Sequence, residues 1–312
     1  MEGVSGYIHR NAHKAHFGHI DKYFAPFVVA DLTMGMNAKS LNDILISNNP
    51  DIRLIPQILS NNGREFCHTA RQMKQHGYNE INLNLGCPSR IVASKNRVSA
   101  FLAMKKELKT FLEEIFSDAV TEISIKTRAG KEQHDEFYEL IEIFNHFPVK
   151  ELIIHPRVQT DLYRNKPNLD VFKDALKLCK MPVCYNGDIF TLQDFKVIQA
   201  AFPEVDTFML GRGILSNPGI ADLIVASKKI DKSDFEDFHT QLYSGYQETL
   251  IEERKILCKM KETWFYMSQI FTNYESYLNE IRRSLTLETY EQTVNRLFRE
   301  QVLVDECQGY SV

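Results

Sequence analysis

Short β-rich runs alternate with segments of helical spacing over about the first 235 residues, and this alternation constrains the fold most. We expect strands at 22–29, 53–60, 80–86, 122–128, 151–157, 182–188 and 207–213. Between these runs, apolar residues recur every three or four positions, as at Phe66, Ala70 and Met73. Such alternation is typical of parallel βαβ units.

The predicted strands share a second property, which concerns their ends. Each is apolar at its start and finishes in polar or glycine-containing sequence, such as NLGCP, KTRAG, NGD and GRG. In a (β/α)8 TIM barrel, the loops after the strand C-termini form the active-site face, so these endings would meet at one site. An open doubly wound sheet also binds ligands there, but the convergence of so many polar ends favours the barrel.

The predicted strands number seven, whereas closure of this barrel needs eight. The missing strand belongs before 22–29, separated from it by a helix at 6–17 that ends at Gly18. Only MEGVS stands before that helix. We therefore expect the first barrel strand to be mostly absent, either because the true start lies upstream or because the product is truncated.

Beyond about residue 235, helical spacing replaces the alternation. In 254–271, residues such as Met260 and Trp264 fall on one apolar arc, while Lys255 and Lys259 lie off it. A further helix is expected from about Thr286, a suitable N-cap. The sequence thus predicts a barrel domain at 1–235 and an all-helical domain at 236–312.

Charge and cysteine content exclude several classes of protein. A net charge of −4 and a pI near 6.2 give no overall basic surface for nucleic acid, so any RNA contact must come from a local cluster. The six cysteines form no C-x-x-C pair, which argues against a zinc site or a disulfide framework. No membrane-spanning run or signal peptide is evident, so we expect a soluble cytoplasmic protein. We also expect a monomer.

One histidine series has the spacing of metal ligands. His9, His13, His16 and His19 are separated by four, three and three residues. No carboxylate or cysteine nearby completes a ligand set, and the segment has the character of an outer barrel helix. We expect a solvated helix face and no metal.

Cationic and glycine-rich strand ends predict an anion site. Lys126 and Arg128 end one strand and His155 and Arg157 the next, while Arg212 lies between two glycines. Glycine lets backbone N–H groups approach a phosphate, and arginine offers a forked donor. Further strand-end polar residues suited to a bound ring or its phosphate are Gln57, Asn84, Asn186, Gly187, Asp188 and Gly211.

Cys87 is the sharpest candidate for chemistry. It stands between Gly86 and Pro88, past the last alternating residue of its strand. A buried structural thiol is the common alternative, but this position is that of a side chain presented at a strand exit. An ordinary thiol is mostly protonated at neutral pH, so it can act as a general acid.

Taken in order, these motifs give the chain a specific resemblance over nearly its whole length. MEGVSGYIHRNAH, PQILSN, NLNLGCPS, KTRAG, HPR followed by Tyr163, NGDI and MLGRGILSNP occur in sequence. The chain thereby resembles the tRNA-dihydrouridine synthases, FMN-dependent barrel enzymes with a helical C-terminal RNA-binding domain. The resemblance implies reduction of uridine in tRNA, with hydride from reduced FMN to C6, a proton from Cys87 to C5, and NADPH as reductant.

The resemblance also implies roles for the matched residues. FMN would be held by Gln57, Lys126, His155, Asn186, Gly187, Asp188, Gly211 and Arg212. The substrate would meet Asn84, Lys95, Arg128, Arg157, Tyr163, Lys255 and Lys259.

Two departures from the family pattern leave alternatives open. The strand that normally precedes MEGVT is missing, and the lysine after Cys87, Lys95, is followed by non-glycine residues at 96–100. One alternative is a flavin barrel that acts on a free small molecule, which the helical tail and the Cys87 motif disfavour. Another is an RNA-binding homologue with impaired FMN binding.

Overall fold

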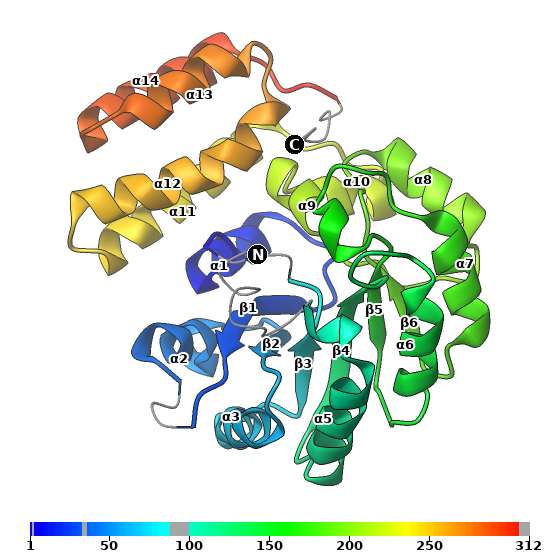
Figure 1. Cartoon of the computed structure of the whole chain (residues 1–312). Coiled ribbons are helices and arrows are strands. Elements are labelled where there is room, and N and C mark those ends of the chain that lie inside the picture. Colours follow the sequence, from blue (N-terminus) through cyan, green and yellow to red (C-terminus); the bar gives the residue numbers. More distant parts are fainter. Residues whose placement is uncertain (2, 33–35, 88–99, 306–312) are drawn as a thin grey trace.

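The computed structural model of the chain describes residues 1, 3–32, 36–87 and 100–305 (Figure 1). Its strands are β1 (Tyr23–Val29), β2 (Leu54–Leu59), β3 (Glu80–Asn84), β4 (Glu122–Arg128), β5 (Leu152–His155) and β6 (Val183–Tyr185). The helices among the strands are α1 (Tyr7–His16), α2 (Ala38–Ile44), α3 (Gly63–Gln75), α5 (Lys105–Ser117), α6 (Glu136–Phe144), α7 (Leu169–Leu178), α8 (Leu192–Ala201), α9 (Arg212–Ser216) and α10 (Ile220–Ala226). The C-terminal helices are α11 (Lys232–Thr249), α12 (Glu253–Met267), α13 (Tyr274–Arg283) and α14 (Leu287–Glu300). Short 3-10 turns are η1 (Ile46–Asn48), η2 (Ala100–Ala103), η3 (Gln159–Asp161) and η4 (Ser268–Ile270).

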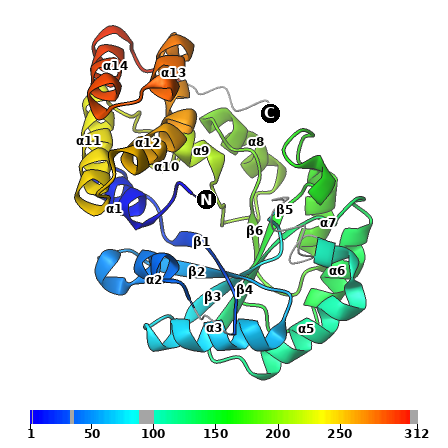
Figure 2. The same cartoon turned by 60° about the vertical axis from the view of Figure 1, so that its left-hand side comes forward.

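The six strands form one parallel sheet whose spatial order follows the chain, from β1 to β6. Parallel neighbours in chain order, joined by helices on one face, are the arrangement of a (β/α) barrel. The outer helices α3, α5, α6 and α7 surround the sheet (Figure 2). Six of the predicted strands, and the predicted helices at 6–17 and from 286, are therefore confirmed.

The seventh predicted strand, at 207–213, is wrong in its extent. Phe208 makes a single parallel bridge to Tyr185, supported by a hydrogen bond of 2.8 Å from Met209 N to Tyr185 O. The chain then leaves the extended conformation at Gly211, with φ −115° and ψ −99°, and α9 begins at Arg212. The GRG sequence thus belongs to a turn and a helix start instead of a strand end.

Burial explains why these segments form strands and helices. Every residue of β2 and β3 is buried, as expected for parallel strands covered on both faces. The outer helices begin at side-chain caps: Asn62 accepts from Glu65 N, and Thr191 accepts from Asp194 N. None of the helices in the described ranges is long and apolar enough to cross a bilayer.

The C-terminal helices have an apolar core of their own. Trp264 and Leu297 are fully buried in it, and the apolar arc predicted for 254–271 lies inside it, although α12 ends at Met267. Ala12 and Phe17 belong to the same core because α1 packs against α11 (Figure 2). A segment from the start of the chain therefore joins the barrel to the helical region.

This packing corrects the expectation of a solvated histidine face. His9 and His13 are buried between α1 and α11, and burial lowers the pKa of His9 to about 3 and of His13 to about 4. His13 Nε2 lies 2.9 Å from Pro218 O, and its Nδ1 lies 2.8 Å from Tyr23 Oη. Helical spacing alone does not reveal that a second helix covers this face.

Candidate active site

The strand C-termini bring the predicted residues to one end of the sheet. The register of β3 and β4 sets Asn84 beside Lys126, and that of β4 and β5 sets Arg128 beside His155. Because neighbouring parallel strands end at the same edge, polar side chains that are far apart in sequence become neighbours. The expected convergence is therefore present in the structure.

The exit of β3 is shaped by Asn84 and Gly86. The side-chain Oδ1 of Asn84 accepts a hydrogen bond of 3.1 Å from Gly86 N. A Cβ on Gly86 would lie 3.2 Å from the carbonyl carbon of Thr127, a tight contact that glycine avoids where the chain passes close to β4. Cys87 follows this turn and is half-buried. The turn thus brings the cysteine to the strand-end face.

Lys126 is a buried cation that has no carboxylate partner among the described residues. It makes no hydrogen bond or ion pair there, and burial lowers its pKa to about 8. Arg128 lowers this pKa further, whereas Cys184 and Cys87 oppose the shift. The Cys87 thiol and the Lys126 ammonium are therefore within electrostatic range of each other. An anionic ligand near Lys126 would stabilise the ammonium and raise its pKa again.

Asp188 is held between two arginines. Arg157 approaches it with both terminal nitrogens, one at 2.9 Å and the other closer, and Arg212 Nη2 lies 2.7 Å from its Oδ1. The Arg157 side chain is almost fully buried. A two-point pair of this kind fixes the orientation of both groups. Asp188 thus aligns Arg212, the residue expected at a phosphate.

Arg212 retains an unsatisfied donor. Its Nη1 is buried and has no hydrogen-bond partner among the described residues. A Cβ added to Gly211 would meet nothing within 4 Å, so there is open space beside this backbone. A Cβ on Gly187 would lie 2.1 Å from Tyr185 Oη, so that glycine is required by packing. An orphaned guanidinium nitrogen next to open space fits a bound oxyanion.

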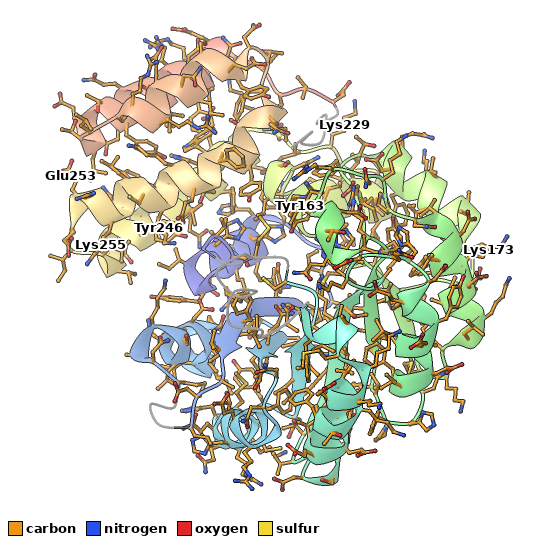
Figure 3. All side chains as sticks on the ribbon, viewed as in Figure 1. Tyr163, Lys173, Lys229, Tyr246, Glu253 and Lys255 are labelled. Carbon is orange, nitrogen blue, oxygen red and sulfur yellow. The ribbon has the colours of Figure 1, made fainter. Side chains whose placement is uncertain are left out.

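His155 and Tyr163 lie beside this cationic group. Burial lowers the pKa of His155 well below its ordinary value, and Arg128, Lys126, Arg157 and Arg212 lower it further. Its Nε2 lies 3.1 Å from Arg157 Nη1, so the neutral ring accepts from the guanidinium. The Arg212 guanidinium lies 4.1 Å from the Tyr163 ring centroid (Figure 3). The site is therefore rich in cations and poor in acids.

Two predicted ligands use their amide nitrogens within the protein. Gln57 Nε2 donates to Asn82 Oδ1 at 2.8 Å, and Asn186 Nδ2 donates to Met209 O at 2.8 Å. Each still has its amide oxygen available at the strand ends.

Arg128, predicted as a substrate contact, uses its donors on backbone carbonyls. It is buried and donates to the carbonyls of Gly86, Val158 and Leu162 at 2.8 to 3.2 Å. Those bonds tie the β3 exit to the loop that carries Tyr163. Arg128 thus positions the two sides of the site.

Sequence reasoning missed two residues of this region. Asn82 lies one alternation before Asn84 and links Gln57 to Ser124 through hydrogen bonds of 2.8 and 3.0 Å. The period-two pattern of EINLN could have identified it. Tyr266 comes from α12, which packs on α9. No signal in the sequence links that helix to the barrel.

The predicted RNA-contacting lysines are dispersed. Lys255 pairs with Glu252 and projects from the outer end of α12, far from Tyr163 in Figure 3. Lys259 donates to Gly3 O at 2.6 Å and pairs with Glu262 at 2.9 Å. Lys95, and the non-glycine segment up to residue 99, lie outside the described residues.

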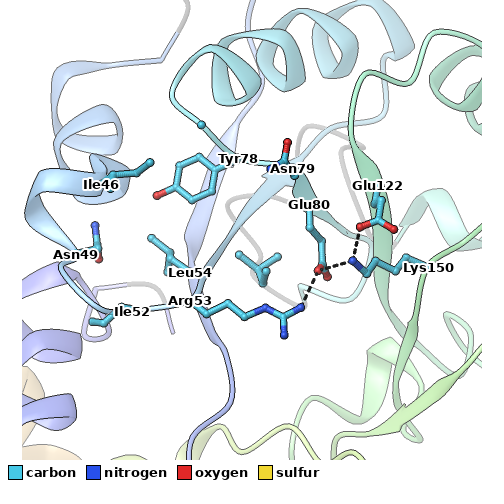
Figure 4. Close-up of a pocket in the computed structure, with 12 residues that line it drawn as sticks. Ile46, Asn49, Ile52, Arg53, Leu54, Tyr78, Asn79, Glu80, Glu122 and Lys150 are labelled. Atoms are coloured by element: carbon cyan, nitrogen blue, oxygen red, sulfur yellow. Dashed lines mark hydrogen bonds and ion pairs between the residues drawn. The ribbon is translucent and has the colours of Figure 1, made fainter.

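A separate cavity of about 340 Å³ lies at the opposite end of the sheet (Figure 4). Residues near the strand N-termini line it, among them Arg53, Glu80 and Glu122. Lys150 pairs with Glu80 at 3.0 Å and also with Glu122. In a barrel this end contributes to stability, so we assign the cavity no part in the chemistry.

The strand-end site fits the cofactor that the sequence implies. FMN carries a phosphate and a ring whose reduced form is anionic, so it needs cations at two points. The orphaned Arg212 donor and the open space at Gly211 suit the phosphate. The Lys126 ammonium, which has no ion pair in the described part of the chain, suits the ring. Within the described residues, no group of three or more His, Cys, Asp and Glu side chains could hold a metal.

Comparison with solved structures supports the barrel. Morphinone reductase superposes on 76% of this chain with a TM-score of 0.52 and 8% identity, which covers 85% of that protein. The old yellow enzyme homologue from Zymomonas mobilis gives a TM-score of 0.51 with 10% identity and covers 76% of this chain and 88% of that one. At these identities the similarity establishes the fold alone: a TIM barrel followed by a helical region.

Sequence comparison identifies the family. The chain is 26% identical over 172 residues to tRNA-dihydrouridine synthase B of Escherichia coli K12, and 28% over 174 residues to the tRNA-dihydrouridine(16) synthase of Aquipseudomonas alcaligenes. These matches cover 55% of this chain and 53% and 52% of the relatives, so the chain matches about half their length. The family model for dihydrouridine synthase matches residues 1–309. The chain therefore belongs to the dihydrouridine synthase family.

Proposed function

We propose that this chain reduces uridine in tRNA to 5,6-dihydrouridine, with FMN as cofactor and NADPH as reductant. One observation supports the proposal: Cys87, at the β3 exit, lies within electrostatic range of Lys126, a cation with no ion pair among the described residues. A proton donor beside a site for an anionic ring suits the addition of a hydride and a proton across a C=C bond.

The cofactor would lie across the strand ends. Lys126 would face the electron-rich edge of the ring, and Arg212, aligned by Asp188, would bind the phosphate with Gly211. Residues proposed to hold FMN are Gln57, Lys126, His155, Asn186, Gly187, Asp188, Gly211 and Arg212. Once reduced by NADPH, bound FMN would supply the hydride for C6 of uracil.

Cys87 would supply the proton for C5. In this proposal its Sγ–H bond breaks as the C5–H bond forms, and solvent reprotonates the thiolate. Lys126 would stabilise the thiolate in the meantime, since a neighbouring cation favours the charged form of a thiol. Asn84 would hold the β3 exit in place through Gly86 N.

The uracil must leave the RNA stack to reach this site, because C5 and C6 are not accessible in a stacked helix. Tyr163 offers an aromatic face and Asn84 an amide beside the target. We propose that Arg128 and Arg157 act indirectly, by fixing the Tyr163 loop and Asp188. Lys95, Lys255 and Lys259 remain proposed contacts to the RNA, as does an RNA-binding role for the helical domain at 236–312.

The decisive experiment compares RNA from cells with and without the gene by mass spectrometry. We expect dihydrouridine to disappear at one or more tRNA positions and to return with the wild-type gene. The purified protein should be yellow and should form dihydrouridine in unmodified tRNA when NADPH is added. Unchanged dihydrouridine in the deletion strain, with no activity in vitro, would contradict the proposal.

Cofactor content and substrate distinguish the alternatives. A colourless protein that binds tRNA but cannot take up FMN would favour an RNA-binding homologue. A yellow protein that oxidises NADPH with a free small molecule, and leaves tRNA unchanged, would favour a different flavin enzyme. Cytoplasmic location and the monomeric state also remain predictions.

A further inference from the structure

A groove of about 510 Å³ lies between the start of the chain and the helical region. Its walls come from three segments that are distant in sequence. The groove residues used below are Gly3, Val4, Lys261, Phe265, Tyr266 and Arg282. In Figure 2 the N-terminus lies beside α12, in agreement with this arrangement.

The groove borders the candidate active site. Tyr266 lies on α12, which packs on α9, the helix that begins at Arg212. The pKa of Tyr266 is raised chiefly by burial, with Tyr163 adding to the rise and Arg212 opposing it, so these side chains are near one another. Lys259 holds the opposite wall by donating to Gly3 O at 2.6 Å. A strand of RNA whose uridine enters the site would pass along this groove.

The charge of the groove suits a phosphate. The Lys261 ammonium donates to the carbonyl of Ser284, a neutral partner, and the Arg282 guanidinium lies over the Phe265 ring and forms no ion pair within the described chain. Among the described residues, one carboxylate lines the groove, that of Glu262, and it is paired with Lys259 at 2.9 Å. Within this part of the chain Lys261 and Arg282 therefore have no carboxylate partner, although residues 241–312 carry 11 acidic and 8 basic side chains.

The groove also has an aromatic surface. Phe265 is half-buried, and the Arg282 guanidinium lies 5.2 Å from its ring centroid. An aromatic face with adjacent arginine is a common stacking surface for an unpaired base. Phe265 and Tyr266 meet edge to face, with their ring centroids 5.0 Å apart. Two adjacent aromatic side chains therefore line the groove.

We infer that this groove binds a nucleotide flanking the target uridine, with its base on Phe265 and its phosphate at Lys261 and Arg282. The inference rests on the proposed function, because it assigns the groove to the same RNA. On this inference, the helical region contacts the RNA close to the reacting uridine.

Two variants test the two parts of this contact, with unmodified tRNA transcript as the probe. Phe265→Leu keeps an apolar side chain but removes the ring, and should weaken RNA binding about tenfold, with Phe265→Tyr restoring it. Arg282→Gln should also weaken binding. It should reduce the slope of log Kd against log salt by about 1, the value expected for the loss of one phosphate contact. The matched control is Arg283→Gln, the next residue on α13, which is exposed and does not line the groove.

The results separate this inference from the proposed function. The inference is supported if all variants keep the wild-type flavin content and the slope of log Kd against log salt changes for Arg282→Gln alone. For Phe265→Leu that slope should stay unchanged. If the wild type binds tRNA and forms dihydrouridine while both groove variants match it, the groove assignment is overturned and the function stands. A wild-type protein that neither binds tRNA nor modifies it would overturn both.

Discussion

The guanidinium of Arg157 and the carboxylate of Asp188 meet through two N–H···O contacts, and the same carboxylate accepts from Arg212 at 2.7 Å. Arg157 is buried and cannot move to solvent if its partner is lost. Asp188 therefore acts as a fixed link between the barrel core and the residue proposed to bind phosphate. Its side chain need not touch the cofactor to matter for its binding.

Removing the charge of Asp188 should weaken FMN binding. In Asp188→Asn one carboxylate oxygen becomes an NH2 group, which cannot accept from the arginine N–H that faces it, so the alignment of Arg212 is weakened. We expect Kd for FMN to rise roughly 30-fold, equivalent to about 2 kcal/mol, as measured by quenching of flavin fluorescence. The control is Asp174→Asn on the outer helix α7, whose carboxylate accepts from Tyr138 Oη. Equal FMN affinity in both variants would refute this role.

Replacing Cys87 should separate flavin chemistry from uridine reduction. Cys87→Ala should keep its bound flavin and its oxidation of NADPH, because the thiol is not among the proposed FMN contacts. Dihydrouridine formation should fall about 100-fold or more, the usual contribution of a general acid. Single-turnover assays with pre-reduced enzyme and tRNA measure this step directly. Near-normal product in that assay would remove Cys87 from the mechanism.

Removing the Asn84 side chain should disturb the presentation of Cys87. Asn84→Ala leaves Gly86 N without its acceptor, which should lower the free energy of unfolding by about 1 kcal/mol. We expect dihydrouridine formation to fall about tenfold with FMN still bound. Asn84→Asp keeps an acceptor oxygen and should recover stability. If the aspartate variant is as unstable as the alanine variant, the hydrogen bond is not what fixes the turn.

The depressed pKa of Lys126 has a defined effect on stability. In the apo protein its pKa is about 8, below the ordinary 10.5, so between these values the unfolded chain binds more protons than the folded one. Stability should therefore rise with pH in this window, and the destabilising effect of the buried charge should be complete below pH 8. Lys126→Met should be more stable than wild type at pH 7, by about 1 to 3 kcal/mol.

Denaturant unfolding of the apo proteins at pH 7 and pH 10 checks this prediction. The advantage of Lys126→Met should shrink at the higher pH. Lys173→Met, at an exposed position on α7 (Figure 3), should follow the wild type at both values. A constant difference between Lys126→Met and wild type would show that the lysine charge is not the cause.

Local sequence determined the secondary structure and the residues of the strand-end site. Six strands appear where apolar runs predicted them, because a parallel strand covered on both faces must be almost wholly apolar. Gln57, Lys126 and Asp188 could be identified because each interrupts that pattern at a strand end. The GRG segment could not be resolved in this way, since glycine and arginine fit a strand end and a turn equally well.

Tertiary structure alone decided what each polar atom faces. The sequence suggested that Arg128 contacts the substrate. In the folded chain, its N–H groups donate to three backbone carbonyls that surround the side chain. The sequence also could not reveal that α11 buries His13, or that α12 brings Tyr266 next to the barrel. Periodicity shows which residues share one face of a helix or strand. The element that packs against that face depends on contacts between segments that are distant in the sequence.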